Sequence, residues 1–337
     1  MRSSNDFTDS LEIMQSMPLV SVIILNWNGV KFIQKCLDSV LASDYSNLEV
    51  IVSDNGSVDG SEELIKRDYP QVILIENKRN LGFCEGNNIA IERSKGDIVI
   101  LLNNDTEVDK NWIKEIVRIA QNPEVGIIGC ALYFAHTKFI ETAGFCIHPS
   151  GRNILKYTRL QEVDYVSGGA LAVKRSVLER IGLLDPFFFA YCEDMDLCYR
   201  AKKGGYKVVM AYNAIVHHYG SQSWRRMPIK QMYLSERNRL YFIFKHFQGL
   251  RILKTLTYYE FLYFLMALKK VVTGKTVPKR MDIINSNSYS VHGELFKTML
   301  HMLALRLMAF VLLLIWPLYW SVITARYQPK QRVGLKR

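Results

Sequence analysis

Short apolar runs alternate with segments of helical periodicity in the first 125 residues of the chain. Runs rich in Val, Ile and Leu predict strands that are buried on both faces, because no polar face alternates along them. Between the runs, apolar residues recur every three or four positions, as helices with one buried face require. This order predicts an α/β fold in which helices cover both faces of a mostly parallel sheet. The predicted strands are 19–25, 48–52, 72–75 and 98–102.

Helices are predicted between these strands and after the last of them. Residues 33–41 and 87–93 have helical spacing of their apolar positions. We expect Asp109 to cap a further helix, which buries Trp112 and the apolar residues that follow it. For the helix that runs through residue 65, three residues compete as the N-cap, and the pattern leaves the choice open. These residues are Ser57, Asp59 and Ser61.

The run at 98–102 stops abruptly at three polar side chains, Asn103, Asn104 and Asp105. In an open α/β sheet, ligands bind just beyond the carboxyl ends of such strands. A carboxylate there, beside amide oxygens, suits a divalent cation that keeps some waters and contacts a diphosphate. An Asx turn explains the same residues without any ligand, so this stretch alone leaves both interpretations open.

Polar loops with glycines follow the other predicted strands. Such loops at one edge of a sheet offer backbone N–H groups to phosphates and a carboxylate to a base or ribose. Each loop alone is ordinary turn chemistry, but four of them at strand ends favour a ligand site. No GxGxxG follows the first strand, so the dinucleotide-binding fingerprint is absent. The loops lie at 26–29, 54–57, 80–83 and 86–88.

Four of these stretches together resemble a known enzyme family. The family is glycosyltransferase family 2, whose inverting members have the GT-A fold, a Rossmann-like mixed sheet with helices on both faces. Within the family, the chain is most similar to the rhamnosyltransferase-like branch, which builds bacterial surface polysaccharides. The resemblance covers residues 19–247 and rests on VSVIILNWNG, VSDNGSVDGS, NLGFCEGNN and ILLNNDT, in this order.

The resemblance implies roles for residues of these stretches. Asp54 is expected to contact the uracil or thymine of a UDP- or dTDP-linked sugar. Asn103 and Asp105 stand where the family has the Asp-x-Asp motif that holds Mg²⁺ or Mn²⁺. Because Asn103 replaces the first carboxylate, Asp105 is the only charged candidate ligand in this motif. The implied nucleotide-sugar-binding residues are Asn26, Asn28, Asp54, Asn55, Ser57, Asn80, Gly82, Phe83, Asn87, Asn104, Gly168 and Gly169.

Three carboxylates at 193, 194 and 196 follow an aromatic run at 187–191. Capping and the helix dipole explain one or two carboxylates at a helix start. Aromatic neighbours also exclude water and raise the pKa of a carboxyl group, as a general base requires. The string EDMDLCYR resembles the family's Glu-Asp motif, which implies that Asp194 is the base and that Glu193 supports it or positions the acceptor. We expect Asp196 to be structural and to pair with Arg200, four residues further along the helix.

Two further stretches in the second half of this region are expected to line the site. The glycines at 168 and 169 precede an apolar strand, where they either permit close approach of the donor sugar, as the resemblance implies, or form a bulge. A strand at 206–212 leads to His217 and His218, which point to opposite faces if the strand continues. The string HYGSQS resembles the family's late histidine motif, which favours His218 as a metal ligand, with His217 as the fallback.

Charge divides the chain into two parts. Residues 1–220 hold 23 Lys+Arg and 28 Asp+Glu, whereas residues 221–337 hold 20 and 4. This asymmetry predicts parts with different partners. Six scattered cysteines fit a reduced, cytosolic setting, and residues 1–17 have no signal-peptide pattern. We therefore predict an N-terminal extension at 1–17, a GT-A catalytic domain at 18–248 and a basic, apolar helical region at 249–337.

The basic region is predicted to associate with membrane. Residues 255–268 are apolar but too short to span a bilayer, whereas residues 307–325 are long enough and contain no charge. Lysines and arginines flank both segments, as in regions that bind anionic lipid. Spanning and surface-lying arrangements both stay open. Either arrangement places the catalytic domain on the cytoplasmic face of the cell membrane, and the charge needs no nucleic acid as a partner.

Together these features predict an inverting glycosyltransferase of cell-surface polysaccharide synthesis. It would move a sugar, with rhamnose as a candidate, from a nucleoside diphosphate to a lipid-linked or glycan acceptor by a metal-assisted single displacement. The alternative is a membrane-tethered protein that binds nucleotide sugars, or serves as a scaffold, without catalysis. Such a protein has no need of Glu193 and Asp194. The choice between Mg²⁺ and Mn²⁺ stays open, because both accept an oxygen-rich site.

Overall fold

The computed structural model describes residues 17–135, 137–155, 162–220 and 228–259. The chain divides into two compact units, Met1–His246 and Phe247–Arg337. All strands of the described residues lie in the first unit, which also contains the candidate site residues.

The first unit is built on a nine-stranded mixed sheet with the strand order β3-β2-β1-β4-β10-β6-β11-β5, to which β7 adds beside β6. The strands β3, β2, β1 and β4 are parallel, as the sequence predicts for the four runs. The rest is mixed, because β10 runs antiparallel to both of its neighbours and β5 antiparallel to β11. The main strands are β1 (Val20–Asn26), β2 (Leu48–Asp54), β3 (Ile73–Glu76), β4 (Ile98–Asn103), β5 (Thr106–Val108), β6 (Val125–Phe134), β10 (Ala170–Lys174) and β11 (Lys207–His218).

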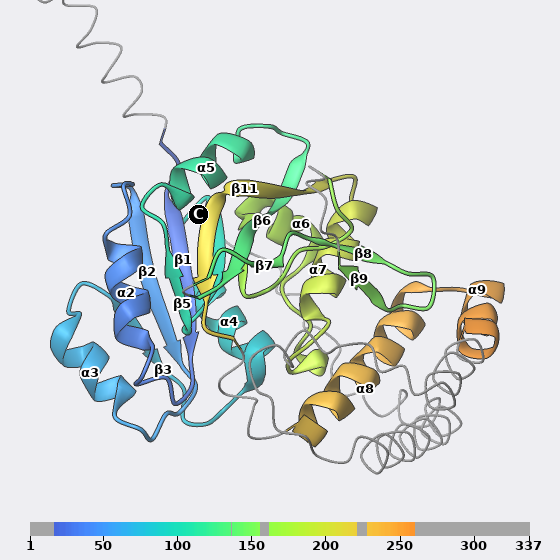
Figure 1. Cartoon of the computed structure of the whole chain (residues 1–337), viewed down its shortest axis with the longest axis horizontal. Coiled ribbons are helices and arrows are strands. Elements are labelled where there is room, and N and C mark those ends of the chain that lie inside the picture. Colours follow the sequence, from blue (N-terminus) through green and yellow to red (C-terminus); the bar gives the residue numbers. More distant parts are fainter. Residues whose placement is uncertain (1–16, 136, 156–161, 221–227, 260–337) are drawn as a thin grey trace, which may run out of the picture. The chain divides into compact units, whose positions relative to one another are not determined.

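Three short strands, two short helical segments and eight α-helices complete the described elements (Figure 1). The short strands are β7 (Ile140–Thr142), β8 (Phe145–Ile147) and β9 (Asn153–Leu155), and β8 pairs with β9 as a separate hairpin. The helices of the first unit are α2 (Ile33–Leu41), α3 (Ser61–Asp68), α4 (Gly82–Arg93), α5 (Trp112–Ala120), α6 (Arg175–Ile181), η1 (Pro186–Phe188), α7 (Glu193–Lys203) and α8 (Pro228–His246).

Helices cover both faces of the sheet, as predicted. The helices α2, α3 and α5 bury their apolar faces in one core with alternate residues of the central strands. The helix α5 shows why: Trp112, Ile113 and Ile116 share one face of the helix and are fully buried. The helices α4, α6 and α7 contact the sheet strands with apolar residues that lie outside this core (Figure 1). The periodicity of apolar residues therefore predicts which faces of the strands and helices pack together into layers.

The predicted helix caps are wrong in two places. The N-cap of α5 is Asn111, and Asp109 contributes only its carbonyl, which accepts a hydrogen bond from Trp112 N at 3.1 Å. The N-cap of α3 is Gly60, in a left-handed conformation with φ 86°, which a glycine adopts without strain. Asp59 still accepts a hydrogen bond from the first helical N–H, that of Ser61, at 3.1 Å.

The strand β11 is longer than the predicted 206–212 and contains both histidines. Its pairing with the parallel β6 is irregular between Ala211 and Ile215. Val209 and Ala211 face the core of α2, α3 and α5 before this irregularity, and Ala214 and Val216 face it afterwards. The inward-facing positions therefore change from odd to even residue numbers, as a β-bulge of odd length requires.

The described part of the second unit is short. It contains α9 (Leu250–Lys254) and a π-helical turn, η2 (Thr255–Tyr259). Leu250 and Leu253 of α9 are exposed. None of the helices in the described ranges has both the length and the apolar character that a membrane crossing needs. The predicted membrane segment 307–325, and 260–268 of the other one, lie outside the described residues.

Candidate active site

The carboxyl ends of β1 and β2 lie side by side, with Asn26 in register with Asp54. Asn26 Nδ2 donates a hydrogen bond to Asp54 Oδ2 at 2.7 Å, and Ser57 donates two more to Asp54, from its N and its Oγ, each at 2.7 Å. Asp54 is fully buried beneath this loop. Its carboxylate is therefore occupied by protein donors, and the base contact that the resemblance implies stays a prediction.

The end of β4 joins the same group of side chains. Asn104 Nδ2 donates to Asn26 Oδ1 at 2.8 Å, which connects the residues after β4 to the end of β1. Gly29 lies against this pair, so a Cβ there would be 2.1 Å from Asn104 Nδ2 and 2.2 Å from Asn26 Oδ1. Asn28 is exposed, and its backbone N–H donates to Ser57 Oγ at 2.8 Å. Asn28 and Ser57 are thus the reachable part of this edge.

Three predicted binding residues fix the start of α4 rather than a loop. The sequence predicts helix only from residue 87, whereas α4 begins at Gly82. Asn80 Oδ1 accepts a hydrogen bond from Gly82 N at 2.8 Å, and Asn55 Nδ2 donates to Gly82 O at 3.0 Å. Asn87 is buried and donates to Phe83 O at 2.8 Å. These amides hold the first turn of α4 at the same edge of the sheet as β1 and β2.

The two glycines before β10 connect the end of β4 to the start of α7. Asn103 N donates to Gly169 O at 3.0 Å, and Gly168 N donates to Asp194 Oδ2 at 3.0 Å. A Cβ on Gly168 would lie 3.4 Å from the Phe83 ring and 3.5 Å from Asp194 Cβ. A Cβ on Gly169 would lie 3.2 Å from Asn103 Nδ2. The glycines therefore let three predicted site residues come close together.

The predicted metal ligands Asp105 and His218 lie next to each other, each 7% exposed. His218 Nε2 is 3.2 Å from Asp105 Oδ1. The other ring nitrogen, Nδ1, is 2.7 Å from Glu141 Oε2 of β7. Burial opposes a charge on this imidazole, but the two nearby carboxylates outweigh burial and raise the pKa of His218 to about 10.

The fallback residue His217 faces the other side of β11. Its Nε2 is 3.5 Å from Asp109 Oδ1. Alternation along the strand puts it on the opposite face from His218, as predicted for neighbouring strand residues. It lines a cavity of about 380 Å³ together with Glu107, Ala135, Thr137, Lys138 and Tyr219. The structure thus places His218, and not His217, beside Asp105.

The donor atoms around His218 fit a divalent cation once Nε2 has lost its proton, since only a neutral imidazole nitrogen binds a metal ion. Glu141 occupies Nδ1 and thereby orients the ring, as carboxylates commonly do for metal-binding histidines. The opposite nitrogen, Nε2, is buried and makes no hydrogen bond of good geometry within the described residues, although it lies beside Asp105. The part of the chain that the structure describes contains no group of three His, Cys, Asp or Glu arranged to hold a metal ion alone. A cation here would therefore need oxygens from a ligand or water as well.

Glu193 and Asp194 begin α7; Glu193 is buried and Asp194 half-buried, and their hydrogen bonds differ. Asp194 accepts hydrogen bonds from Gly168 N at 3.0 Å and Met195 N at 2.7 Å. Burial raises the pKa of Asp194, and the backbone hydrogen bonds partly offset this rise. Burial, followed by the charge of Asp194, raises the pKa of Glu193 well above its ordinary value. Glu193 Oε2 has no hydrogen-bond partner in the described chain. The hydrogen bonds therefore stabilise the ionised form of Asp194 and give no such support to Glu193 Oε2.

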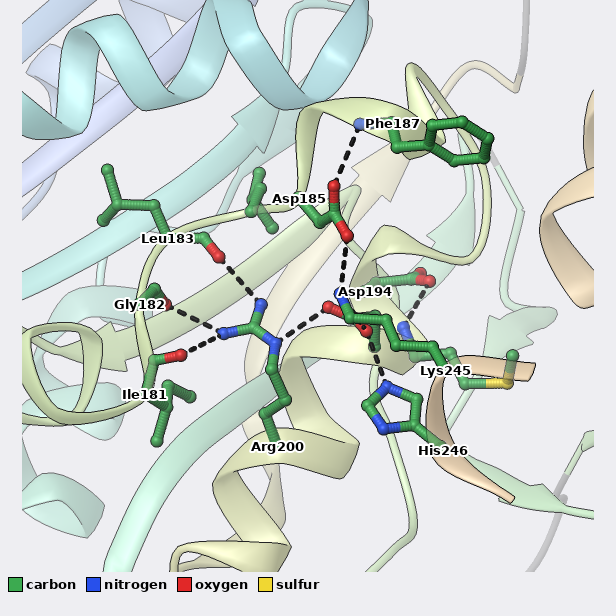
Figure 2. Close-up of polar contacts among 12 residues, drawn as sticks. Ile181, Gly182, Leu183, Asp185, Phe187, Asp194, Arg200, Lys245 and His246 are labelled. Atoms are coloured by element: carbon green, nitrogen blue, oxygen red, sulfur yellow. Dashed lines mark hydrogen bonds and ion pairs between the residues drawn. The ribbon is translucent and has the colours of Figure 1, made fainter. Parts of the chain in front are cut away.

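Asp196 is the anchor of α7, as predicted. It is fully buried and accepts from Arg200 Nε at 2.8 Å, which confirms the predicted ion pair. Two residues of α8 add to it, Lys245 at 2.9 Å and His246 at 2.7 Å. Burial alone would raise the pKa of Asp196, but His246, Arg200 and Lys245 hold it at about 2. Figure 2 shows how these side chains converge from α7 and α8.

The same cluster ties α7 to the segments before it. Arg200 Nη1 and Nη2 donate to the carbonyls of Ile181, Gly182 and Leu183 at 2.6, 3.0 and 2.8 Å (Figure 2). Lys245 also pairs with Asp185, at 2.6 Å. Sequence reasoning missed the contributions of α8 and of Glu141, because neither belongs to a motif and both act through contacts distant in sequence.

The sequence and the fold are similar to those of known proteins. The model of glycosyl transferase family 2 matches residues 21–182. Uncharacterized protein y4gI of Sinorhizobium fredii is 29% identical over 62% of this chain, and the O-antigen biosynthesis protein RfbC of Myxococcus xanthus is 27% identical over 61% of it. The chain spans only 25% and 18% of these two relatives. The N-acetylglucosaminyl-diphospho-decaprenol L-rhamnosyltransferase of Mycobacterium tuberculosis is 23% identical over 68% of this chain and 86% of its own length.

Solved structures share the fold. The mannosyltransferase PcManGT from Pyrobaculum calidifontis, in complex with GDP-Man and Mn²⁺, has a TM-score of 0.56 and 16% identity, covering 88% of this chain and 86% of that one. GalNAc-T7 with UDP, GalNAc and Mn²⁺ has a TM-score of 0.53 and 19% identity, covering 60% of this chain and 43% of that one. The mixed sheet predicted from the sequence is therefore GT-A-like. The match to glycosyl transferase family 2 thus covers residues 21–182, in the strand-rich first part of the chain.

Proposed function

We propose that the chain is an inverting glycosyltransferase of surface-glycan synthesis, which moves a sugar from a nucleoside diphosphate to a hydroxyl group of a lipid-linked or glycan acceptor. The relatives named for O-antigen biosynthesis and for rhamnosyl transfer to a lipid-linked sugar support this assignment. The neighbours that hold GDP-Man or UDP with Mn²⁺ support a nucleotide-sugar donor and a divalent cation.

One observation carries the proposal: two adjacent carboxyl groups at the start of α7 differ in their hydrogen-bond partners. Burial raises the pKa of both, but Asp194 has backbone N–H donors and Glu193 Oε2 has none. Backbone N–H donors stabilise the ionised form of Asp194, whereas Glu193 Oε2 has no donor to stabilise its charge. A general base must be ionised and still basic, and a protonated neighbour can donate a hydrogen bond. Asp194 thus fits the role of base, and Glu193 fits the role of a group that supports it or orients the acceptor.

The proposed reaction is one displacement at the anomeric carbon. Asp194 takes the proton from the acceptor hydroxyl, whose oxygen forms the new bond to the anomeric carbon. The bond from that carbon to the diphosphate oxygen breaks, and the nucleoside diphosphate leaves with the electron pair. Attack on the face opposite the leaving group inverts the configuration. Asp105 and His218 would hold the divalent cation, which when bound neutralises the charge that grows on the leaving diphosphate.

The donor and the cellular setting follow as parts of the same proposal. The rhamnosyl-transferring relative supports a dTDP- or UDP-linked donor with rhamnose as the first sugar to test. The basic composition of residues 249–337 supports attachment to anionic lipid, with the first unit on the cytoplasmic face. Nucleotide-sugar donors and a lipid-linked acceptor would meet the enzyme there.

A donor screen with the full-length protein tests the proposal. Thermal unfolding is measured with UDP-, dTDP- and GDP-linked sugars, each with and without Mn²⁺, since a ligand that binds only the folded state raises the melting temperature. We expect one donor class to stabilise the protein only when Mn²⁺ is present. That donor is then incubated with a lipid-diphosphate-linked sugar, and the anomeric configuration of the product is determined by NMR.

Transfer with inverted configuration supports the enzyme. A donor that stabilises the protein but is neither transferred nor hydrolysed would instead identify a nucleotide-sugar-binding protein without catalysis. Transfer with retained configuration would refute the single displacement, because one attack from the opposite face cannot retain it.

A further inference from the structure

The loop that leads into Glu193 and Asp194 has an uncommon backbone. Phe189, Tyr191 and Cys192 all have positive φ, of 63°, 74° and 67°. Residues other than glycine adopt this conformation at a cost of about 1–3 kcal/mol each. Such strained residues persist only where contacts with the surrounding structure hold the backbone in place. Because Cys192 directly precedes Glu193, the conformation of this loop sets the direction in which both carboxyl groups enter the site. Something in the fold must therefore hold residues 189–192 in place.

The helix α8 supplies one side of this support. Asn238 is fully buried, and its Nδ2 donates to the carbonyls of Phe188, Ala190 and Tyr191 at 2.8, 2.7 and 2.7 Å. The loop does not place these carbonyls in the regular hydrogen-bond pattern of a helix or sheet, so they need other donors. One amide group of α8 thus holds three carbonyl groups in and next to the strained segment.

Arg237 fixes the orientation of the Asn238 amide. Its Nε and Nη2 donate to Asn238 Oδ1 at 2.9 and 2.7 Å, so the amide oxygen is occupied and Nδ2 faces the loop. The same guanidinium also donates to Phe187 O at 2.8 Å and Phe188 O at 2.9 Å. Two neighbouring residues of α8 therefore bind the backbone from 187 to 191.

The first turn of α4 supplies the other side. Phe83 N and Cys84 N both donate to Phe189 O, at 2.6 and 3.2 Å. Gly82 approaches the same residue so closely that a Cβ would lie 2.5 Å from the Phe189 ring. The first turn of α4 contains predicted nucleotide-sugar-binding residues. The loop is thus held between the donor edge of the site and α8.

We propose that Asn238 is a positioning residue for transfer, which holds the strained 189–192 loop so that Asp194 is aligned with the acceptor while the first turn of α4 holds the donor. The inference rests on the proposed transferase function. Asn238 does not reach the reacting atoms, so its removal leaves donor affinity intact and lowers only the rate of the step that needs Asp194. A residue that served stability alone would change neither kcat nor KM of the folded protein.

The test uses the full-length protein with the substitution Asn238→Asp. Aspartate keeps the size of the side chain and still accepts from Arg237, but it removes the N–H donors that hold the loop. We expect kcat to fall at least about 10-fold, with the KM for the donor within about 2-fold of wild type. We also expect the amides of 189–192 to exchange hydrogen faster, measured by mass spectrometry, a readout independent of activity.

The matched control is Ile243→Ala on the same helix. Ile243 is fully buried, and its side chain lies against Gly151, outside the loop. Its truncation lowers the melting temperature by leaving a cavity. We expect its kcat, at a temperature well below unfolding, to equal that of wild type. If Asn238→Asp does not fold, Arg237→Gln replaces it, because it leaves Asn238 in place and removes the hydrogen bonds to Phe187 and Phe188.

The outcomes separate the two proposals. A wild-type protein that transfers no sugar from any donor would overturn the proposed function, and the positioning role with it. An active wild type whose Asn238→Asp variant keeps its kcat, or loses activity only through a higher donor KM, would overturn the positioning role alone. A fall in kcat shared by the Ile243→Ala control would also overturn it, because general destabilisation would then explain the effect.

Discussion

Asp194 and Asp196 lie two residues apart at the start of α7, but Asp194 is half-buried whereas Asp196 is fully buried, and their partners differ. Asp194 accepts two backbone hydrogen bonds and pairs with no cation in the described residues, and burial raises its pKa. Asp196 is surrounded by Arg200, Lys245 and His246, which hold its pKa at about 2. Burial alone therefore does not decide the charge of a carboxyl group.

The difference teaches which features separate a reactive carboxylate from a structural one. A base must accept a proton during the reaction, so cations that lower its pKa would make it inactive. An anchor must stay charged, because protonation weakens its ion pairs with the basic side chains around it. In the proposed enzyme, the start of α7 carries both the base and the anchor. This is possible because Asp194 points toward Gly168 and Asp196 toward α8.

The largest expected effect breaks the reactive side of this comparison. Replacing Asp194 by Asn should lower kcat by about 10²- to 10⁴-fold, because the acceptor hydroxyl loses its base. Donor affinity, measured by titration calorimetry, should not change. Since the folded state disfavours the charged form of Asp194, the variant should also melt at a temperature equal to or above that of wild type. A variant that transfers sugar at the wild-type rate would refute the assignment.

The next effect concerns stability and breaks the anchor. Replacing Asp196 by Asn should destabilise the protein by about 3–5 kcal/mol, because Arg200, Lys245 and His246 lose the fully buried carboxylate that they share. The control is Asp164→Asn, which removes a half-exposed ion pair with Lys202 of the same helix and should cost less than about 1 kcal/mol. Both are read from thermal and urea unfolding. Equal losses in the two variants would show that the Asp196 cluster adds nothing to stability.

The pH dependence of stability sharpens the same comparison. The pKa of Asp196 lies below its value in an unfolded chain, so its contribution is present above pH of about 4 and disappears as the pH falls toward about 2. The difference in unfolding free energy between wild type and Asp196→Asn should therefore shrink by on the order of 2 kcal/mol across this window. Urea titrations at several pH values measure it. A difference that stays constant from pH 5 to pH 2 would contradict the pairing.

The smallest expected effect extends the comparison to a third carboxylate, Glu141, whose partner is the single imidazole of His218. Replacing Glu141 by Gln should weaken Mn²⁺ binding by about 10- to 100-fold, because the ring loses the group that orients it. The affinity is measured by electron paramagnetic resonance of free Mn²⁺ in the presence of donor nucleotide. Glu107→Gln, on the His217 side of β11, is the control and should bind Mn²⁺ like wild type. If both variants bind Mn²⁺ with equal affinity, Glu141 does not contribute to the metal site.

Local patterns predicted much of the fold. The four apolar runs form β1 to β4, and their parallel order follows from the helices between them. The buried face of α5 and the pairing of Asp196 with Arg200 also follow from helical spacing alone. These features depend on residues close together in sequence, where propensity and periodicity suffice.

Other features depend on contacts between distant segments, and sequence patterns do not contain them. The strand β10 lies between β4 and β6 and runs antiparallel to both, an arrangement that no local sequence pattern specifies. Glu141 reaches His218 only because β7 pairs with β6 beside β11. No glycine in the sequence signals the left-handed backbone at Phe189, Tyr191 and Cys192. Hydrogen bonds from Asn238 of α8 hold this segment instead.

The irregular pairing of β11 has a consequence for comparing this chain with its relatives. Residues 212–214 are an insertion of odd length relative to β6, so they reverse which positions of β11 face Asp105. Strict alternation counted from the start of the strand therefore selects His217 as the partner of Asp105. Counted back from the end of the strand, alternation selects His218, which is the observed partner. Which imidazole reaches the acidic residue is thus decided by the length of a short irregular segment and not by the identity of either histidine. Relatives with a different number of residues there should be aligned from the C-terminal end of this strand, or the wrong ring will be matched.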